Sequence, residues 1–569
     1  MPTVLSLNQA KAAAPPPACF CPVTSPLVSE EETNEQPVLP SEASLGRRRM
    51  LLGLGFGAAN LALLRRLGTR NPTPAAPTNQ LVTGSTTSTT STTSTTSLAS
   101  LATSPPILNA ASMVDPVNHV FDTVITAGRV IDPASGFDAL VDIGIDQGII
   151  TYLGNETLTG RDTLDARNLV VSPGFIDLLS YPPNGYGEWF KIADGVTSNL
   201  CLHGIDDPMV DFLEKAATQD PPLNYGGATD QYEHRKITGA NIDYLRDVDD
   251  VSLQDLTNRA ALDLEAGALG IHEQPEYVPG VTFEEMLGHG AVAAQYGVPL
   301  CLHIRTGETS DPDLQKAAVT EAIEVARQAG CAVHIEHLNS TGGTGRMAEA
   351  IAQIEAARLE GLAITACTYP YTFWATYAGT PRFDNFQDKF GITYNDLQVA
   401  GTTKRVTESE WPSIRQQGLL TAAFAMSEQD ITTALKAPWM MIGSDAILGP
   451  LHNNHPRSAG CFSRILGVYV REQSVLSLID ALARMTIYPA QLLETASPDL
   501  AQRGRLQGGA IADITIFDPT TIIDNADLEN PGQESTGVHH VIVNGQIVRR
   551  NQKNDKTKRP GVPLLRGET

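Results

Sequence analysis

The chain has 569 residues, of which 42% are hydrophobic and 18% charged, so it is long enough for more than one domain and is not disordered in composition. Its formal net charge of −24 argues against nucleic acid as a partner, because a nucleic-acid-binding surface must be basic. The seven cysteines are an odd number. They do not indicate a disulfide framework, and we expect most of them to be small buried residues.

Residues 1–115 are predicted to be a leader rather than a packed domain. Arg47 and Arg48 precede an apolar run that ends at Leu64, and this run is short for a membrane span. The pattern at about residues 47–64 resembles a twin-arginine export signal; a buried helix or a plain membrane anchor is the alternative. The Ser/Thr-rich stretch at about residues 83–105 is predicted to be a flexible linker. We therefore expect export to a periplasm or lumen, or a membrane tether through this segment, rather than a cytoplasmic location.

Predicted strands occur at both ends of the folded region. They cover residues 120–125, 127–132, 141–145 and 148–153 near its start, and 512–517 and 541–548 near its end. The last of these is centred on Asn544 and Gly545, a pair that accepts the positive φ of a two-residue hairpin turn. We predict a small β-sandwich built from residues 116–171 and 501–555, with residues 556–569 as a tail.

Between these ends, predicted strands and helices alternate about every 30 residues, which is the period of βα units. The strands are at 268–272, 299–303, 331–337, 362–368 and 440–443, and the helices at 252–266, 311–329, 346–360 and 429–436. Such alternation indicates an α/β fold with an open doubly wound sheet or a closed barrel. No G-x-G-x-x-G follows an early strand, and the flanking sandwich strands favour a (β/α)8 barrel over residues 172–500.

Three polar residues lie at the carboxyl ends of predicted strands of this barrel, where barrel enzymes carry their sites: His303, His337 and Asp445. Imidazoles hold zinc, and a carboxylate takes the proton from the activated water in zinc hydrolases. A strand-end histidine taken alone is more often a hydrogen-bonded structural residue, and this is what we expect of His272 and His334.

Several motifs, in order along residues 120–548, resemble the amidohydrolase superfamily and its N-acyl-D-amino-acid deacylase group. The His337-Leu338-Asn339-Ser340 stretch is most similar to the members that act on acyl-D-glutamate. The other segments are SPGFID at 172–177, DGVTS at 194–198, YPYT at 369–372, HPRSAG at 455–460, MTIYPA at 485–490, and GRL and ADI at 504–506 and 512–514.

The resemblance implies a role for each matching residue. His303 and His337 match the paired metal histidines, and Asp445 matches the aspartate that activates the water and protonates the leaving nitrogen. Arg457 and Tyr369 match positions that hold the substrate carboxylate, and Arg305 is placed to assist them. A guanidinium suits this task because its fork of N–H donors matches a carboxylate.

The chain departs from the family where Gly-Phe-Ile-Asp is normally followed by His-x-His, because Leu179 and Tyr181 stand there. Leucine cannot bind a metal, so the usual two-metal site is excluded. His203 or Cys201, near the end of the second strand, is the candidate third ligand. We therefore predict one zinc ion per chain, held by three protein ligands with a position left open for water.

Two classes of function fit these residues. The first is hydrolysis of the amide bond of an N-acyl-(D-)amino acid, a small molecule, through a metal-activated water. The second is a catalytically inactive binding protein on the same barrel, which the loss of the first-strand histidines would favour. A hydrolase of cyclic amides would differ in pocket shape alone, and the sequence leaves that alternative open.

Overall fold

A computed structural model describes residues 114–182, 184–238, 250–306, 311–447 and 454–567. Residues 1–113 of the predicted leader lie outside this description, including the twin-arginine-like segment, the linker, Cys19 and Cys21. The remaining cysteines, Cys201, Cys301, Cys331, Cys367 and Cys461, are all free and buried. Within the described residues, none of the helices combines the length and apolar character that a membrane span requires.

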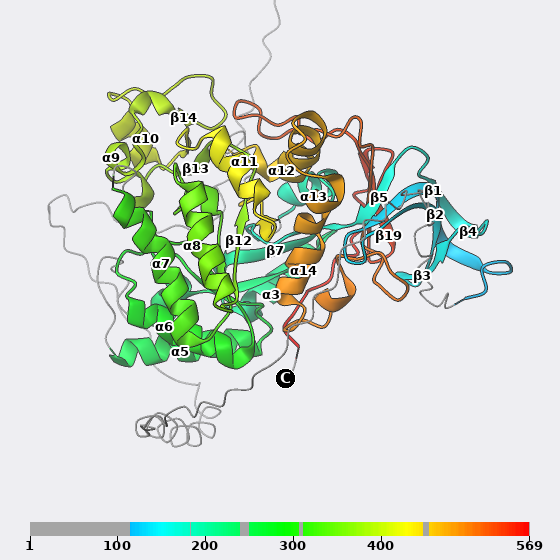
Figure 1. The fold of residues 1–569 in the computed structure, drawn as a ribbon, viewed down its shortest axis with the longest axis horizontal. Coiled ribbons are helices and arrows are strands. Elements are labelled where there is room, and N and C mark those ends of the chain that lie inside the picture. The colour runs from blue at the N-terminus through cyan, green and yellow to red at the C-terminus, as the bar shows by residue number, and fades with distance from the viewer. Residues whose placement is uncertain (1–113, 183, 239–249, 307–310, 448–453, 568–569) are drawn as a thin grey trace, which may run out of the picture. The chain divides into compact units, whose positions relative to one another are not determined.

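The centre of the described structure is a parallel sheet of eight strands that curls into a barrel (Figure 1). Its order is β16-β12-β11-β10-β9-β8-β7-β6. The segments that follow the two outer strands meet, because Tyr181 N donates to Ala446 O at 3.1 Å and Asp445 N donates to Leu179 O at 2.7 Å. The predicted (β/α)8 barrel is therefore confirmed. The strands are β6 (Phe175–Asp177), β7 (Val196–Ile205), β8 (Asn224–Asp230), β9 (Ile271–Glu273), β10 (Leu300–Leu302), β11 (Val333–Ile335), β12 (Ile364–Thr368) and β16 (Met440–Ile442).

Helices follow the strands and cover the outside of the barrel. The one after β10 shows the local signals that set its bounds: Asp311 caps its first turn by accepting from Asp313 N and Leu314 N, and Gly330 ends it with φ 68°. The barrel helices are α2 (Gly187–Ala193), α3 (Met209–Gln219), α4 (Gln231–Thr238), α5 (Asp250–Glu265), α6 (Phe283–Tyr296), α7 (Pro312–Ala329), α8 (Met347–Leu359), α11 (Glu428–Lys436), α12 (Arg457–Arg464), α13 (Leu478–Met485) and α14 (Ile487–Leu493).

Two apolar layers stabilise the barrel. Strand side chains such as Leu300 and Val333 pack outward against the helices, while others such as Leu200 and Met441 pack in the interior cluster. Leu564, from the predicted tail, is fully buried in the same interior cluster. The tail is thus packed onto the barrel, with Leu564 N donating to Tyr225 O at 2.7 Å.

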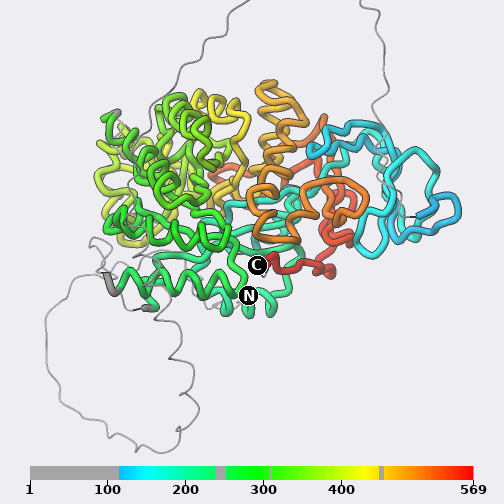
Figure 2. The backbone as a smooth tube through the Cα atoms, turned by 60° about the horizontal axis from the view of Figure 1, so that its bottom comes forward, coloured from blue at the N-terminus to red at the C-terminus, as the bar shows by residue number. Residues whose placement is uncertain are grey.

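The second sheet joins strands from both ends of the folded region, as the sequence predicts. Figures 1 and 2 show the blue and cyan strands beside the red ones. Asn544 and Gly545 form the predicted hairpin turn, with φ of 48° and 77°. The strands are β1 (Val120–Asp132), β2 (Phe137–Asp146), β3 (Ile149–Gly154), β4 (Thr159–Asp165), β5 (Val170–Pro173), β17 (Ile514–Phe517), β18 (Val538–Val543), β19 (Gln546–Arg550) and β20 (Lys553–Asn554).

An insertion between β12 and α11 lies above the barrel in Figure 1. It has a small antiparallel sheet, in the order β13-β15-β14, and two short helices. The elements are β13 (Trp374–Tyr377), α9 (Phe386–Phe390), β14 (Leu397–Val399), α10 (Trp411–Gln417) and β15 (Leu420–Ala423). Because it starts at the carboxyl end of a barrel strand, it can supply side chains to a site at that end.

Candidate active site

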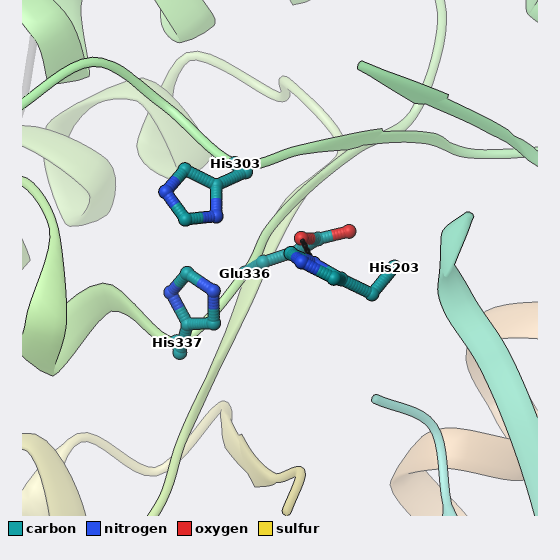
Figure 3. Close-up of side chains that lie close together, drawn as sticks. All are labelled: His203, His303, Glu336 and His337. Carbon is teal, nitrogen blue, oxygen red and sulfur yellow. Dashed lines mark hydrogen bonds and ion pairs between the residues drawn. The ribbon is translucent and has the colours of Figure 1, made fainter. Parts of the chain in front are cut away.

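Four buried side chains converge at the carboxyl ends of three barrel strands. His203 is near the end of β7, His303 follows β10, and Glu336 and His337 follow β11. Their donor atoms all lie within 4.8 Å of one another. Figure 3 shows the rings of His303 and His337 facing a shared space, with His203 and Glu336 on the other side of it. Three imidazoles and a carboxylate at this spacing are a donor set that fits a divalent metal ion.

Each histidine has one ring nitrogen held by a neighbour. Glu336 bonds Nδ1 of His203, Glu276 lies 2.7 Å from Nε2 of His303, and the Ser340 hydroxyl lies 3.1 Å from Nδ1 of His337. Metal-binding histidines are commonly oriented in this way through the nitrogen that does not touch the metal. The other nitrogen of His303, Nδ1, is buried and has no hydrogen-bond partner among the described residues. A metal ion is a fitting partner for the lone pair of this nitrogen.

Burial sets the charge of this cluster. It lowers the pKa of His303 to about 4, against the opposing carboxylate of Glu276. Burial also lowers the pKa of His337 well below the usual range, and the nearby His303 and His203 add to the effect. Neutral imidazoles are the form that binds metals. Burial opposes ionisation of Glu336, but the imidazoles of His203 and His272 keep its pKa well below its usual range.

Asp445, after β16, faces His337 across the site. Its Oδ2 is 3.9 Å from His337 Nε2 and 2.8 Å from Arg457 Nη2. Burial raises the pKa of Asp445, partly opposed by the charge of Arg457, which makes it a stronger base than an exposed aspartate. Both Asp445 and His337 have positive φ, 52° and 25°. Such strained backbone at non-glycine residues clusters at functional sites.

Arg457 is buried at the start of α12 and binds the backbone as well as Asp445. Its Nε donates to Asp445 O at 2.8 Å, and its Nη2 donates to Ala375 O at 3.3 Å. The guanidinium lies 4.7 Å from the centre of the Tyr369 ring. Its Nη1 is buried without a hydrogen-bond partner among the described residues. The structure thus brings Arg457 and Tyr369 together, with the Nη1 amino group of Arg457 unpaired among the described residues.

Three of the predicted site residues, Arg305, Cys201 and Tyr369, do not line the cavity, and Tyr369 packs against the wall residue Arg457. Arg305 forms an ion pair with Glu321 at 3.2 Å and donates to backbone carbonyls that include Pro275 O and Pro279 O. Cys201 packs in the outer apolar layer with residues of α3. It is two residues from His203, which on a regular strand would put both on one face. The pairing of β7 with β8 shifts register between Cys201 and Ile205, and His203 faces the cavity instead.

The structure adds side chains that the motifs did not indicate. Arg382, from the insertion, forms an ion pair with Glu276 and lies 3.2 Å from His303 Nε2. It also donates to Ser340 O and stacks on Trp374. No sequence signal marks Arg382, because the motif found in this part of the chain, YPYT at 369–372, does not include it. Glu336 directly precedes His337, and that adjacency was the available signal.

The cavity enclosed by these residues has a volume of about 10 Å³, which is room for one water molecule. Its walls include Tyr181, Trp374, Thr376 and Arg382 beside the histidines, Asp445 and Arg457. Three of these wall residues come from the insertion. A molecule larger than water fits this space only if side chains of the wall move.

Comparison with known proteins identifies the relatives of this site. A family model described as the amidohydrolase family matches residues 251–549. N-acyl-D-glutamate deacylase of Alcaligenes xylosoxydans xylosoxydans is 32% identical over 467 residues, which are 75% of this chain and 93% of that protein. The chain belongs to the amidohydrolase family. It is a hydrolase that acts on carbon–nitrogen bonds, and the alternative of an inactive relative is not supported.

Solved structures of amidohydrolases agree with this assignment. N-acyl-D-glutamate deacylase from Bordetella bronchiseptica, in complex with zinc and a phosphonate inhibitor, matches with a TM-score of 0.69 at 26% identity, over 79% of this chain and 100% of that one. A D-aminoacylase matches equally well, with a TM-score of 0.69 at 25% identity over 78% of this chain and 100% of its own. Its binuclear metal centre is described as showing one-metal activation and second-metal attenuation.

Proposed function

We propose that the protein hydrolyses the amide bond of N-acyl-D-amino acids with a single divalent metal ion, which we take to be zinc. The observation that carries the proposal is the convergence of His203, His303 and His337 opposite Asp445 and Arg457. The resemblance to N-acyl-D-glutamate deacylases supports the substrate class and the D configuration.

In this proposal the metal is held by His203, His303 and His337. A second ion would lack ligands on the first strand, because Leu179 is packed in the barrel interior and Tyr181 forms part of the cavity wall. A bound zinc ion supplies a Lewis acid that polarises the acyl carbonyl and makes water a better nucleophile at neutral pH.

Asp445 is the proposed general base and general acid. It takes a proton from the attacking water as the oxygen adds to the acyl carbon, and it returns that proton to the nitrogen as the carbon–nitrogen bond breaks. The products are a carboxylate and a free amino acid. Arg457 holds Asp445 in place through the 2.8 Å ion pair, and the burial that raises the pKa of Asp445 suits a group that both accepts and donates a proton.

The cations of the site support an anionic substrate. The unpaired Nη1 of Arg457 is placed to donate to the α-carboxylate of an N-acyl amino acid. Arg382 is a second buried guanidinium in the cavity wall. Arg382 is already paired with Glu276, so the acidic side chain of an N-acyl-D-glutamate is supported by the resemblance to the relatives and not by a free cation. A cyclic amide without a carboxylate would leave Nη1 of Arg457 without a partner, so we do not favour it.

Metal analysis and turnover of purified protein test the proposal. After expression with zinc, the parent should bind one zinc per chain and hydrolyse N-acetyl-D-glutamate, and a chelator should abolish turnover reversibly. His337→Gln should lose the metal, whereas the matched change His334→Gln, at a buried histidine on the same strand, should not. Absence of bound zinc, or absence of hydrolysis of every N-acyl-D-amino acid tested, would contradict the proposal.

We also propose that residues 1–115 direct the protein out of the cytoplasm by a twin-arginine route. The support is the pair Arg47 and Arg48 ahead of a short apolar run. Lysine at both positions should leave a fused reporter in the cytoplasm. Unchanged export would indicate a plain anchor or another signal.

A further inference from the structure

A network of alternating acidic and basic side chains, formed by His203, Glu336, His272 and Asp230, leads from the metal cavity into the barrel. Glu336, which bonds His203 Nδ1, has its Oε2 3.5 Å from His272 Nε2. The other ring nitrogen of His272 lies 3.7 Å from Asp230 Oδ2. All four side chains are buried, and His272 and Glu336 are completely inaccessible to solvent. The proposed reaction uses only His203 of this set directly.

The backbone beside His272 leaves room for this network of side chains. Gly204 has φ 90°, and a Cβ there would lie 2.6 Å from His272 Nδ1 and 2.7 Å from Asp230 Oδ2. Only glycine permits both this conformation and this close approach. Asp230 is held in turn by Tyr232 N at 2.8 Å and by Gln274 Nε2 at 3.3 Å. Asp230 is therefore held in place by groups that lie outside the metal cavity.

We infer that Asp230, His272 and Glu336 position His203 as a metal ligand, an inference that rests on the proposed function. A carboxylate bonded to Nδ1 of His203 fixes the tautomer in which the Nε2 lone pair points into the cavity. His272 contacts the same Glu336 oxygen that bonds His203, and so keeps this carboxylate turned toward the imidazole. Asp230 orients His272 from behind.

His203 needs this support more than its neighbours do. It lies where β7 departs from regular pairing, so the strand does not dictate its direction. His303 and His337 instead follow strands in regular parallel register, and each has its own partner in Glu276 or Ser340. Outer partners of metal ligands typically change metal affinity by about 10- to 100-fold when they are removed.

The experiment compares zinc affinity in the full chain and its variants, measured by competition with a chromophoric chelator. His272→Gln should weaken zinc binding by about 10- to 100-fold while still saturating at one ion per chain. Asp230→Asn, which preserves the side-chain shape, should weaken binding in the same direction. In cobalt-substituted protein, His272→Gln should shift the visible absorption bands, because the geometry at His203 changes.

The matched control is His289→Gln. His289 is equally buried and pairs with a carboxylate, Glu273, at 2.6 Å, but it is not part of this network of side chains. It should leave zinc affinity and the cobalt spectrum unchanged. If the parent binds one zinc and His272→Gln and Asp230→Asn bind it as tightly with the same spectrum, the inference is wrong and the proposed function stands. If His289→Gln weakens zinc binding equally, the effect is general destabilisation and the inference also fails. A parent that binds no zinc overturns the proposed function and this inference with it.

Discussion

Replacement of Arg457 by lysine should penalise substrates according to whether their α-carboxylate is free. Lysine keeps the positive charge beside Asp445 but loses the planar fork of N–H donors. Alanine is a poorer choice here. It would leave the buried Asp445 carboxylate without its counter-ion, and breaking a buried pair costs about 3–5 kcal/mol whatever the substrate.

The expected loss in kcat/KM follows from Nη1 of Arg457, the guanidinium nitrogen that has no hydrogen-bond partner among the described residues. Nε and Nη2 of Arg457 are occupied by Asp445 and Ala375, so only Nη1 is left for substrate. A hydrogen bond to a charged group contributes about 1.5–3 kcal/mol. Its loss should lower kcat/KM by about 10- to 100-fold for an N-acyl-D-amino acid with a free carboxylate. The α-amide of the same substrate should lose much less, since it presents no anion.

The assay measures kcat/KM for both substrates in the parent, in Arg457→Lys and in Arg305→Lys. The last variant makes the same chemical change at an arginine outside the cavity, and it should leave both values unchanged. Thermal melting of each variant reports any loss of stability. An equal penalty on the free acid and the amide in Arg457→Lys, with a lowered Tm, would show that Arg457 is a structural residue and would refute the anionic-substrate assignment.

Three further predictions concern the base, a buried acid and the C-terminal segment. Asp445→Asn should keep its zinc but lower kcat by about 10²–10⁴-fold; loss of zinc would instead make Asp445 a ligand. Burial raises the pKa of Asp194 to about 7, so its contribution to stability is present at acid pH and is lost as pH rises from about 4 to 7. Asp194→Asn should remove this loss. The slope of unfolding free energy against pH, measured by urea titrations, should then change by up to about 1.4 kcal/mol per pH unit. Identical slopes in the parent and the variant would contradict this prediction. Leu564→Ala should cost about 2–5 kcal/mol in the same assay, whereas Leu359→Ala, at a side chain 90% exposed, should cost little. An equally small effect at Leu564 would mean that the C-terminal segment is dispensable.

The sequence was sufficient for the fold and for part of the site. The βα period of about 30 residues and the strands at both ends predict the barrel and the second sheet, because these patterns are local. His303, His337 and Asp445 could be placed for the same reason. His303 and His337 end predicted strands and Asp445 lies just after one, and parallel strands bring their carboxyl ends to one end of a barrel.

Only the tertiary structure decided between His203 and Cys201 and brought in Arg382. The choice between the two ligands depends on a register shift of β7 against β8, which is a property of the pairing and not of the strand's own residues. Arg382 reaches His303 from an insertion, across a gap of 79 residues that no periodicity spans. Arg305 shows the converse: it is two residues from His303 along the chain, but its guanidinium binds carbonyls outside the cavity. Distance along the chain fixes which residues share an element, whereas packing between elements decides which side chains meet.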